Sequence, residues 1–240
     1  MARTVDATGY AVRREAFVDA AQRLIQTEGY EQMSIQDLLD ELDASRGAFY
    51  HYFDSKAALL DAVIARMVTD AMAAVEPIVE DPDLSATEKM RGLFSGIASW
   101  KVERIDLLLA VLQVWLSDGN ALVRERLRRS VVDSMTPVLT RLIGQGSLDG
   151  SFDVADAEHV ARALVSLLLG AQEHAGQLFT GYQAELVTIE DIEGALNAYP
   201  EAFERVLGAR PGSLRWFEPG DLRRWFDLAR LTPLTMEGHR

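Results

Sequence analysis

The sequence of 240 residues contains no cysteine, and this absence removes several classes of chemistry. Disulfide bonds, thiolate metal sites and a cysteine nucleophile are all excluded. The four histidines are His51, His159, His174 and His239, and no two of them have the close spacing of metal ligands. A glycine-rich phosphate loop and a nucleophile elbow are also missing. The sequence therefore predicts neither an enzyme nor a protein that holds a metal or another cofactor.

Long apolar runs are missing as well. The most apolar segment, residues 105–116, contains Asp106 and Gln113 and is too short to cross a bilayer. The first nine residues lack the apolar stretch of a signal peptide. Alternation of apolar and polar residues, the pattern of a strand, does not extend over a useful length. We therefore expect a cytoplasmic, all-α protein, with 48% hydrophobic residues to build its core.

Positive charge is scarce in this chain. The formal net charge is −13, and residues 1–70 contain seven Arg and Lys against twelve Asp and Glu. Because a nucleic-acid-binding protein is expected to carry a basic patch, these totals taken alone argue against DNA binding. DNA binding therefore requires that the basic residues be separated from the carboxylates by their position in the fold.

Residues 34–56 predict two short helices joined by a tight turn. The apolar face of the first helix has the spacing i, i+3, i+4 and i+7 and consists of Ile35, Leu38, Leu39 and Leu42. Ser34 and Asp37 have the spacing of a capping box, and Asp43 then breaks the apolar period. Ser45 can cap the second helix, whose outer side is small and polar. This pattern indicates a helix-turn-helix.

Residues 13–68 resemble the DNA-binding domain of the tetracycline-repressor (TetR) family of bacterial regulators. The most specific part is the run from Gly47 to Lys56, in which an aromatic cluster follows the glycine and the lysine opens the next helix. One departure is Asp43, which stands where the family usually has glycine in the turn. The resemblance implies a homodimeric repressor that binds a palindromic DNA operator and responds to a small-molecule effector.

The second helix of the motif supplies most of the expected DNA contacts. Tyr50, His51 and Lys56 suit phosphate oxygens, which fix the register on the duplex. Arg46 either forks onto a guanine or makes one more phosphate contact, and the sequence leaves both open. The complete expected set is Ser34, Ser45, Arg46, Gly47, Tyr50, His51 and Lys56.

The rest of the chain is expected to be helical, and four segments are predicted. Residues 1–54 form the head, with an arm over 1–10, and residues 55–80 form a connecting helix. Residues 81–209 form an effector-binding and dimerisation domain, and residues 210–240 form an aromatic-rich extension, also expected to be helical. The sequence leaves open whether this extension packs on the helical bundle of its own chain or on a partner subunit. Helices are expected to end near Pro77 and at a loop marked by Gly144, Gly146 and Gly150. A kink within a helix is expected at Pro137.

Several residues of the predicted C-terminal domain are candidates for an effector pocket or a dimer interface. The candidate pocket residues suit a mostly apolar ligand, although ordinary core packing explains them too: Phe94, Trp100, Gln113, Trp115, Met135 and His174. The resemblance places the interface on two late helices, at Leu164, Leu168, Ala171, Ala175, Ile192, Leu196, Tyr199 and Phe203. Asp43 and the acidic head favour an alternative, a helical small-molecule-binding protein or enzyme that has lost DNA binding.

Overall fold

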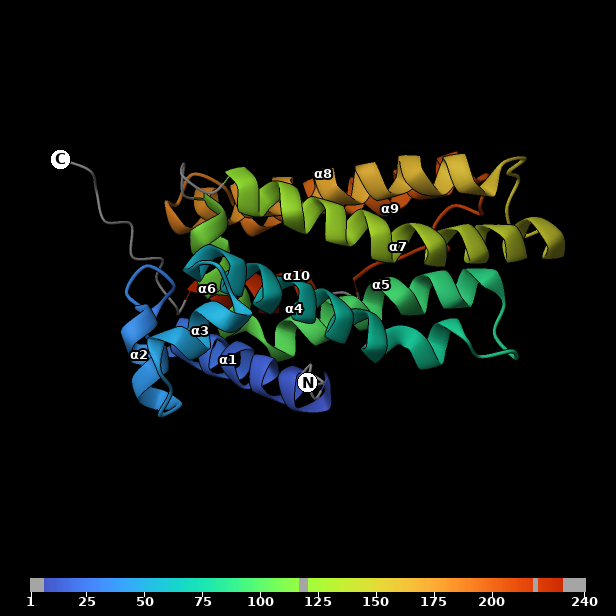
Figure 1. Cartoon of the computed structure of the whole chain (residues 1–240). Helices are drawn as coiled ribbons and strands as arrows, with labels where there is room; N and C mark the ends of the chain where they lie inside the picture. Colours follow the sequence, from blue (N-terminus) through green and yellow to red (C-terminus); the bar gives the residue numbers. More distant parts are fainter. Residues whose placement is uncertain (1–6, 117–120, 218–219, 231–240) are drawn as a thin grey trace. The chain divides into compact units, whose positions relative to one another are not determined.

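The computed structural model describes residues 7–116, 121–217 and 220–230. These residues form ten α-helices and no strand, which confirms the predicted all-helical fold (Figure 1). The helices, in chain order, are α1 (Ala7–Glu28), α2 (Ile35–Glu41), α3 (Arg46–Tyr52), α4 (Lys56–Val79), α5 (Ala86–Glu103), α6 (Ile105–Leu116), α7 (Ala121–Asp149), α8 (Ala157–Gln183), α9 (Ile189–Leu207) and α10 (Asp221–Arg230). Among these helices none is long and apolar enough to cross a membrane.

The chain divides into two compact units. The described residues of the first are 7–67, 106–116 and 121–127, and the second contains residues 68–105 and the described residues from 128 onward. Helices α4 and α7 each begin in the first unit and end in the second. Two helices, rather than the single connecting helix expected from the sequence, therefore run continuously from one unit into the other.

The first unit is built around aromatic side chains of α1 and α3. Phe17 of α1 contacts the rings of Phe49 and Phe53, with 5.7 Å and 6.3 Å between the ring centroids. Leu59 and Leu60 of α4 are fully buried in the same unit. Burial of a large apolar side chain contributes roughly 1.5–3 kcal/mol, so this cluster holds α3 against α1. Helix α1 begins at Ala7, inside the segment that was expected to be an arm.

Capping residues set the beginnings of several helices. Ser34 and Asp37 form a capping box at α2, and Ser85 and Glu88 form another at α5. Thr188 caps α9 in the same way. In each box the hydroxyl accepts a hydrogen bond from a backbone N–H of the first turn, a group with no partner inside the helix. The start at Ser34 is the one predicted from the sequence.

Two expected helix ends are wrong. Helix α4 continues through Pro77 to Val79, because a proline in the last turn removes only one hydrogen bond. Helix α7 continues through Gly144 and Gly146 to Asp149, so the loop begins only at Gly150. At Gly146 an added Cβ would lie 2.0 Å from Cδ2 of Phe152, which shows that this glycine serves packing rather than a turn.

The segment after α9 packs back onto the second unit. Glu204 of α9 is buried, and its carboxylate accepts hydrogen bonds from the backbone amides of Gly212 (2.9 Å) and Leu214 (2.8 Å). These bonds hold the segment that carries Trp216, whose ring stacks on Phe94 of α5 at 4.6 Å between centroids. Helix α10 then contacts α8 and α9. The described part of the extension therefore belongs to the core of its own chain.

Candidate DNA-binding surface

The turn between α2 and α3 is closed by the backbone. Asp43 has φ +46°, a left-handed conformation, and the amide of Ala44 donates to the carbonyl of Leu39 at 2.9 Å. The hydroxyl of Ser45 accepts a hydrogen bond from the amide of Ala48 at 3.2 Å, which starts α3. Asp adopts the left-handed region more readily than most non-glycine residues, so the turn predicted at Asp43 forms without a glycine.

Helix α3 has one buried edge and one exposed edge. Phe49 is fully buried, whereas Tyr50 on the other side is 47% exposed. Three more of the expected DNA-contacting residues are exposed on the helix: Arg46, Gly47 and His51. Because the buried edge fixes the rotation of α3, these side chains share the face available to a partner. The hydroxyls of Ser34 and Ser45 are already engaged as helix caps.

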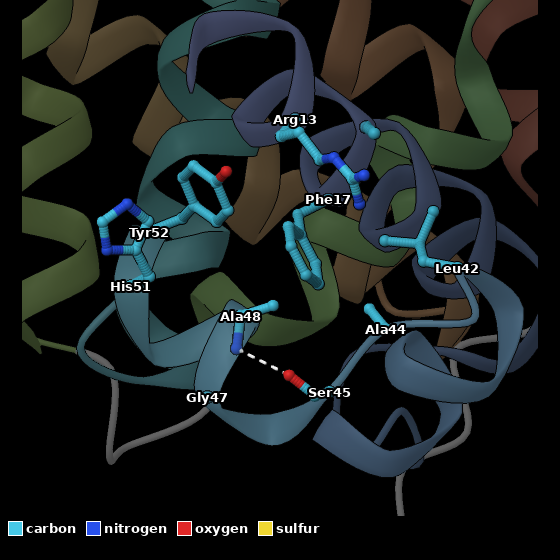
Figure 2. A pocket seen from close by; sticks show the side chains of 10 residues that line it. Arg13, Phe17, Leu42, Ala44, Ser45, Gly47, Ala48, His51 and Tyr52 are labelled. Carbon is cyan, nitrogen blue, oxygen red and sulfur yellow. Dashed lines mark hydrogen bonds between the residues drawn. The ribbon is translucent and has the colours of Figure 1, made fainter. Parts of the chain in front are cut away.

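A pocket of about 540 Å³ lies in the first unit beside α3. Figure 2 shows Arg13 of α1 on one side of it, His51 and Tyr52 of α3 on another, and Ala44 of the turn opposite them. The ring of Tyr10 also contacts His51 and Tyr52, at 5.5 Å and 4.8 Å between centroids. The lining contains an arginine and a histidine but no carboxylate, so this hollow is locally basic within an acidic unit.

The arginines of α1, α3 and α4 fall into two groups. Arg14, Arg23 and Arg66 pair with carboxylates of the same unit. In contrast, Arg13 and Arg46 have no hydrogen bond or ion pair with any described residue. The net negative charge therefore does not prevent a basic face, since the unpaired guanidinium groups lie on the pocket and on the exposed edge of α3.

Lys56 has a structural role that the sequence did not reveal. Its ammonium donates to the carbonyl oxygen of Glu31 at 3.2 Å and lies 4.3 Å from the ring centroid of Tyr30. Burial lowers the pKa of Lys56, although the nearby carboxylates of Glu31 and Asp37 oppose this shift. Lys56 thus ties the start of α4 to the loop between α1 and α2.

The sequence of this head matches a known family. Residues 17–63 match the family described as bacterial regulatory proteins of the tetR family. The chain is a TetR-family transcriptional regulator. The family is one of helix-turn-helix regulators and not of enzymes, in agreement with the sequence analysis.

Curated relatives support this assignment. The regulator EthR of Mycolicibacterium smegmatis is 26% identical over 144 residues, which cover 53% of this chain and 66% of the relative. The repressor DhaR of Mycobacterium sp. strain GP1 is 23% identical over 141 residues, which cover 58% of this chain and 69% of the relative. Both alignments thus span about two thirds of the relative.

Solved structures share the fold. A TetR regulator from Haloarcula marismortui superposes with a TM-score of 0.58 at 24% identity, covering 82% of this chain and 97% of the other. RolR in complex with resorcinol gives a TM-score of 0.61 at 16% identity, covering 93% and 95% of the two chains. At these identities the likeness establishes the TetR-like architecture alone.

The structure describes the side chains of four of the six expected effector residues, and their grouping into one site stays a prediction. Phe94, Trp100 and Met135 are buried in the second unit, and the face of Phe94 is covered by Trp216. The ring of His174 bonds to the Tyr199 hydroxyl, with 3.2 Å between Nδ1 and the oxygen. The side chains of Gln113 and Trp115 lie outside the described residues. Within the described ranges, no group of three or more His, Asp or Glu is arranged to hold a metal ion.

Most of the expected interface residues are buried inside the single chain. Leu164, Ile192 and Phe203 are fully buried, and Leu196 is 4% exposed. The other four are buried or half-buried: Leu168, Ala171, Ala175 and Tyr199. The most buried of these side chains pack inside the chain that contains α8 and α9. Both the contact residues and the pairing of α8 and α9 with a partner stay predictions.

Three residues of these sites were missed by sequence reasoning. Tyr10 was assigned to an arm, Arg13 was not among the expected DNA contacts, and Trp216 was placed only within an aromatic-rich extension. Tyr10 and Trp216 owe their roles to contacts with distant segments, which periodicity does not predict. The unpaired state of Arg13 depends on the direction of its side chain, which only the folded chain shows.

Proposed function

We propose that the chain is a homodimeric repressor whose head binds a palindromic DNA operator. The observation that carries this proposal is the segregation of charge on the first unit. The exposed edge of α3 and the adjoining pocket present Arg46, His51 and Arg13, while other arginines of the unit are neutralised by carboxylates. Phosphate contacts from such a face supply affinity, and a guanidinium in the major groove reads guanine.

Assembly into a dimer is the second part of the proposal. Two recognition helices reach successive major grooves only when they lie about 34–36 Å apart, which a symmetric dimer provides. The exposed faces of α8 and α9 offer small residues for close helix approach. Gly170 and Gly194 are exposed, and an added Cβ at either position would meet no other atom within 4 Å. We infer that these faces, rather than the buried side chains, meet the second copy.

Release by a small, mostly apolar effector is the third part. The second unit buries aromatic side chains, Phe94, Trp100 and Trp216 among them, and helices α4 and α7 continue from this unit into the first. A ligand that favours one position of these helices changes the spacing of the heads. To move a population from 1:99 to 99:1, the ligand must prefer the released state by roughly 5.5 kcal/mol.

The proposal is tested by fluorescence anisotropy with labelled DNA that flanks the protein's own gene. We expect Arg46→Ala to weaken binding and to relax base preference by about 1–3 kcal/mol at one position. Gly47→Leu, on the exposed edge of α3, should abolish binding while the thermal unfolding midpoint stays unchanged. If the wild-type protein binds no DNA at low salt yet binds small molecules, the alternative of a ligand-binding protein without DNA binding is the correct one.

A further inference from the structure

The hollow of about 540 Å³ beside α3 has two kinds of lining, and contact with DNA explains only one of them. Arg13 and His51 supply its basic groups. Half-exposed apolar side chains supply another part of the lining: Ala16, Leu42, Ala44 and Ala48. A DNA phosphate matches the basic groups but not the apolar wall. A ligand that matches the whole lining therefore carries an apolar body as well as a negative charge.

The guanidinium of Arg13 is the group that selects the charge of such a ligand. Arg13 is exposed and bonds to no described residue, whereas Arg14, the next residue along α1, already pairs with Glu15. Among the described residues that line the hollow there is no carboxylate. The N–H donors of Arg13 are thus available, and a guanidinium binds a carboxylate through two parallel hydrogen bonds. The hollow is therefore suited to a carboxylate.

Tyr52 and His51 form an aromatic wall whose rings are held in place by their neighbours. The Tyr52 ring lies 4.9 Å from the His51 ring and 4.8 Å from the Tyr10 ring, between centroids. Tyr10 also contacts His51 at 5.5 Å. Because these rings are already ordered, a ligand that packs on them loses little affinity to side-chain ordering. Figure 2 shows Leu42 across the hollow from Tyr52, and a planar aromatic ring suits the space between them.

We propose that this hollow binds a small aromatic carboxylate, with the carboxylate on Arg13 and the ring between Tyr52 and Leu42. Gly47 and His51 line the same hollow and are also expected DNA contacts. The bound acid and DNA therefore exclude each other, a consequence that rests on the proposed DNA-binding function. All the lining residues belong to the first unit, so this site is separate from the effector site proposed in the second unit.

Phenylpropanoate, phenylpropanol, phenylpropylammonium and acetate test the proposal by isothermal titration calorimetry with the full chain, without DNA and at low ionic strength. The first three probes share one apolar body and differ in the end group, whereas acetate keeps the carboxylate alone. We expect phenylpropanoate to bind saturably with Kd on the order of 1 mM, about fivefold or more tightly than phenylpropanol. Acetate and the ammonium should bind more weakly still. Equal binding of the alcohol or of acetate, tighter binding of the ammonium, or no saturation with the acid overturns the proposal.

Variants at Arg13 then locate the site. Arg13→Gln should weaken phenylpropanoate binding about fivefold or more, because it removes the charge from both hydrogen bonds. Arg13→Lys keeps the charge without the planar fork and should weaken binding less. Arg14→Gln changes the neighbouring, already paired arginine and is the matched control, which should keep wild-type affinity for the acid. Thermal unfolding of each variant verifies the fold, and unchanged affinity in folded Arg13→Gln contradicts the assignment.

Competition with DNA is measured by anisotropy with labelled DNA that flanks the protein's own gene. Phenylpropanoate at ten times its own Kd should weaken DNA binding about tenfold, while acetate at the same concentration controls for ionic strength and should have a much smaller effect. Saturable binding of the acid with unchanged affinity for DNA overturns the mutual exclusion. A chain that binds no DNA refutes the proposed function instead, and the calorimetric result for the acid then stands by itself.

Discussion

At the scale of single residues, Asp43 is the clearest departure from a head suited to DNA. It holds a left-handed backbone conformation and places an exposed carboxylate beside the recognition helix. These two properties can be separated by substitution. Asparagine keeps the tolerance for positive φ without the charge, whereas alanine removes both.

We therefore predict different effects for Asp43→Asn and Asp43→Ala. Both should bind DNA more tightly than the wild type, because a carboxylate near the phosphates is lost. Only Asp43→Ala should lose stability, by about 1 kcal/mol in urea unfolding, because alanine is disfavoured in the left-handed region. Equal unfolding free energies for the two variants would show that the turn does not depend on residue type at this position.

Lys56 and Tyr50 should also differ, although both are expected DNA contacts. Lys56→Ala removes the hydrogen bond to Glu31 and the contact with Tyr30, so we expect a loss of about 1 kcal/mol in unfolding free energy together with weaker DNA binding. Tyr50→Ala alters an exposed ring and should change stability by less than about 0.5 kcal/mol while weakening binding to all sequences. Urea unfolding and anisotropy measure the two effects, and a Lys56→Ala protein of wild-type stability would refute the structural role.

At the scale of elements, helix α7 contains two glycines whose surroundings differ. An added Cβ at Gly144 meets no atom within 4 Å, whereas one at Gly146 would clash with the Phe152 ring. We predict that Gly144→Ala raises the unfolding free energy by about 0.5–1 kcal/mol, because alanine favours a helix interior. Gly146→Ala should lower it, because Phe152 must move. Thermal unfolding tests both, and the same sign for the two variants would contradict this packing.

The elements were predictable where a local pattern decides the structure. Ser34 and Asp37 mark the start of α2 in the sequence, because a capping box lies within four consecutive residues. The end of α7 was predicted wrongly, because glycine weakens a helix by only about 1 kcal/mol and packing on Phe152 outweighs that cost. Sequence periodicity identified Leu196 as apolar but did not tell whether it faces its own chain or a partner. The contact of Trp216 with Phe94 joins distant segments, so no local pattern predicts it.

At the scale of the whole molecule, the dimer is tested on the exposed face of α8. Gly170→Glu should leave the isolated chain folded, because an added side chain has open space there. In a two-fold interface the substitution places two glutamates close together, so we expect dissociation in sedimentation experiments. Ala73→Glu, at an exposed position of α4, is the control and should stay dimeric.

In the same sedimentation experiments, Leu196→Glu should behave differently from Gly170→Glu. Leu196 is 4% exposed within one chain, so its replacement by glutamate should unfold the protein rather than separate intact subunits. A stable dimer for Gly170→Glu, or a monomeric wild type, would refute pairing through this face.

The central claim is that an acidic chain binds DNA through a few unpaired basic residues on the head. The salt dependence of binding to DNA flanking the protein's own gene tests it most directly. We predict saturable binding at low salt, and a slope of log Kobs against log salt that falls by about one unit for Arg13→Ala. Arg14→Ala, which changes an arginine already paired with Glu15, should leave that slope unchanged. No binding at low salt, or equal slopes for wild type and Arg13→Ala, would contradict the account.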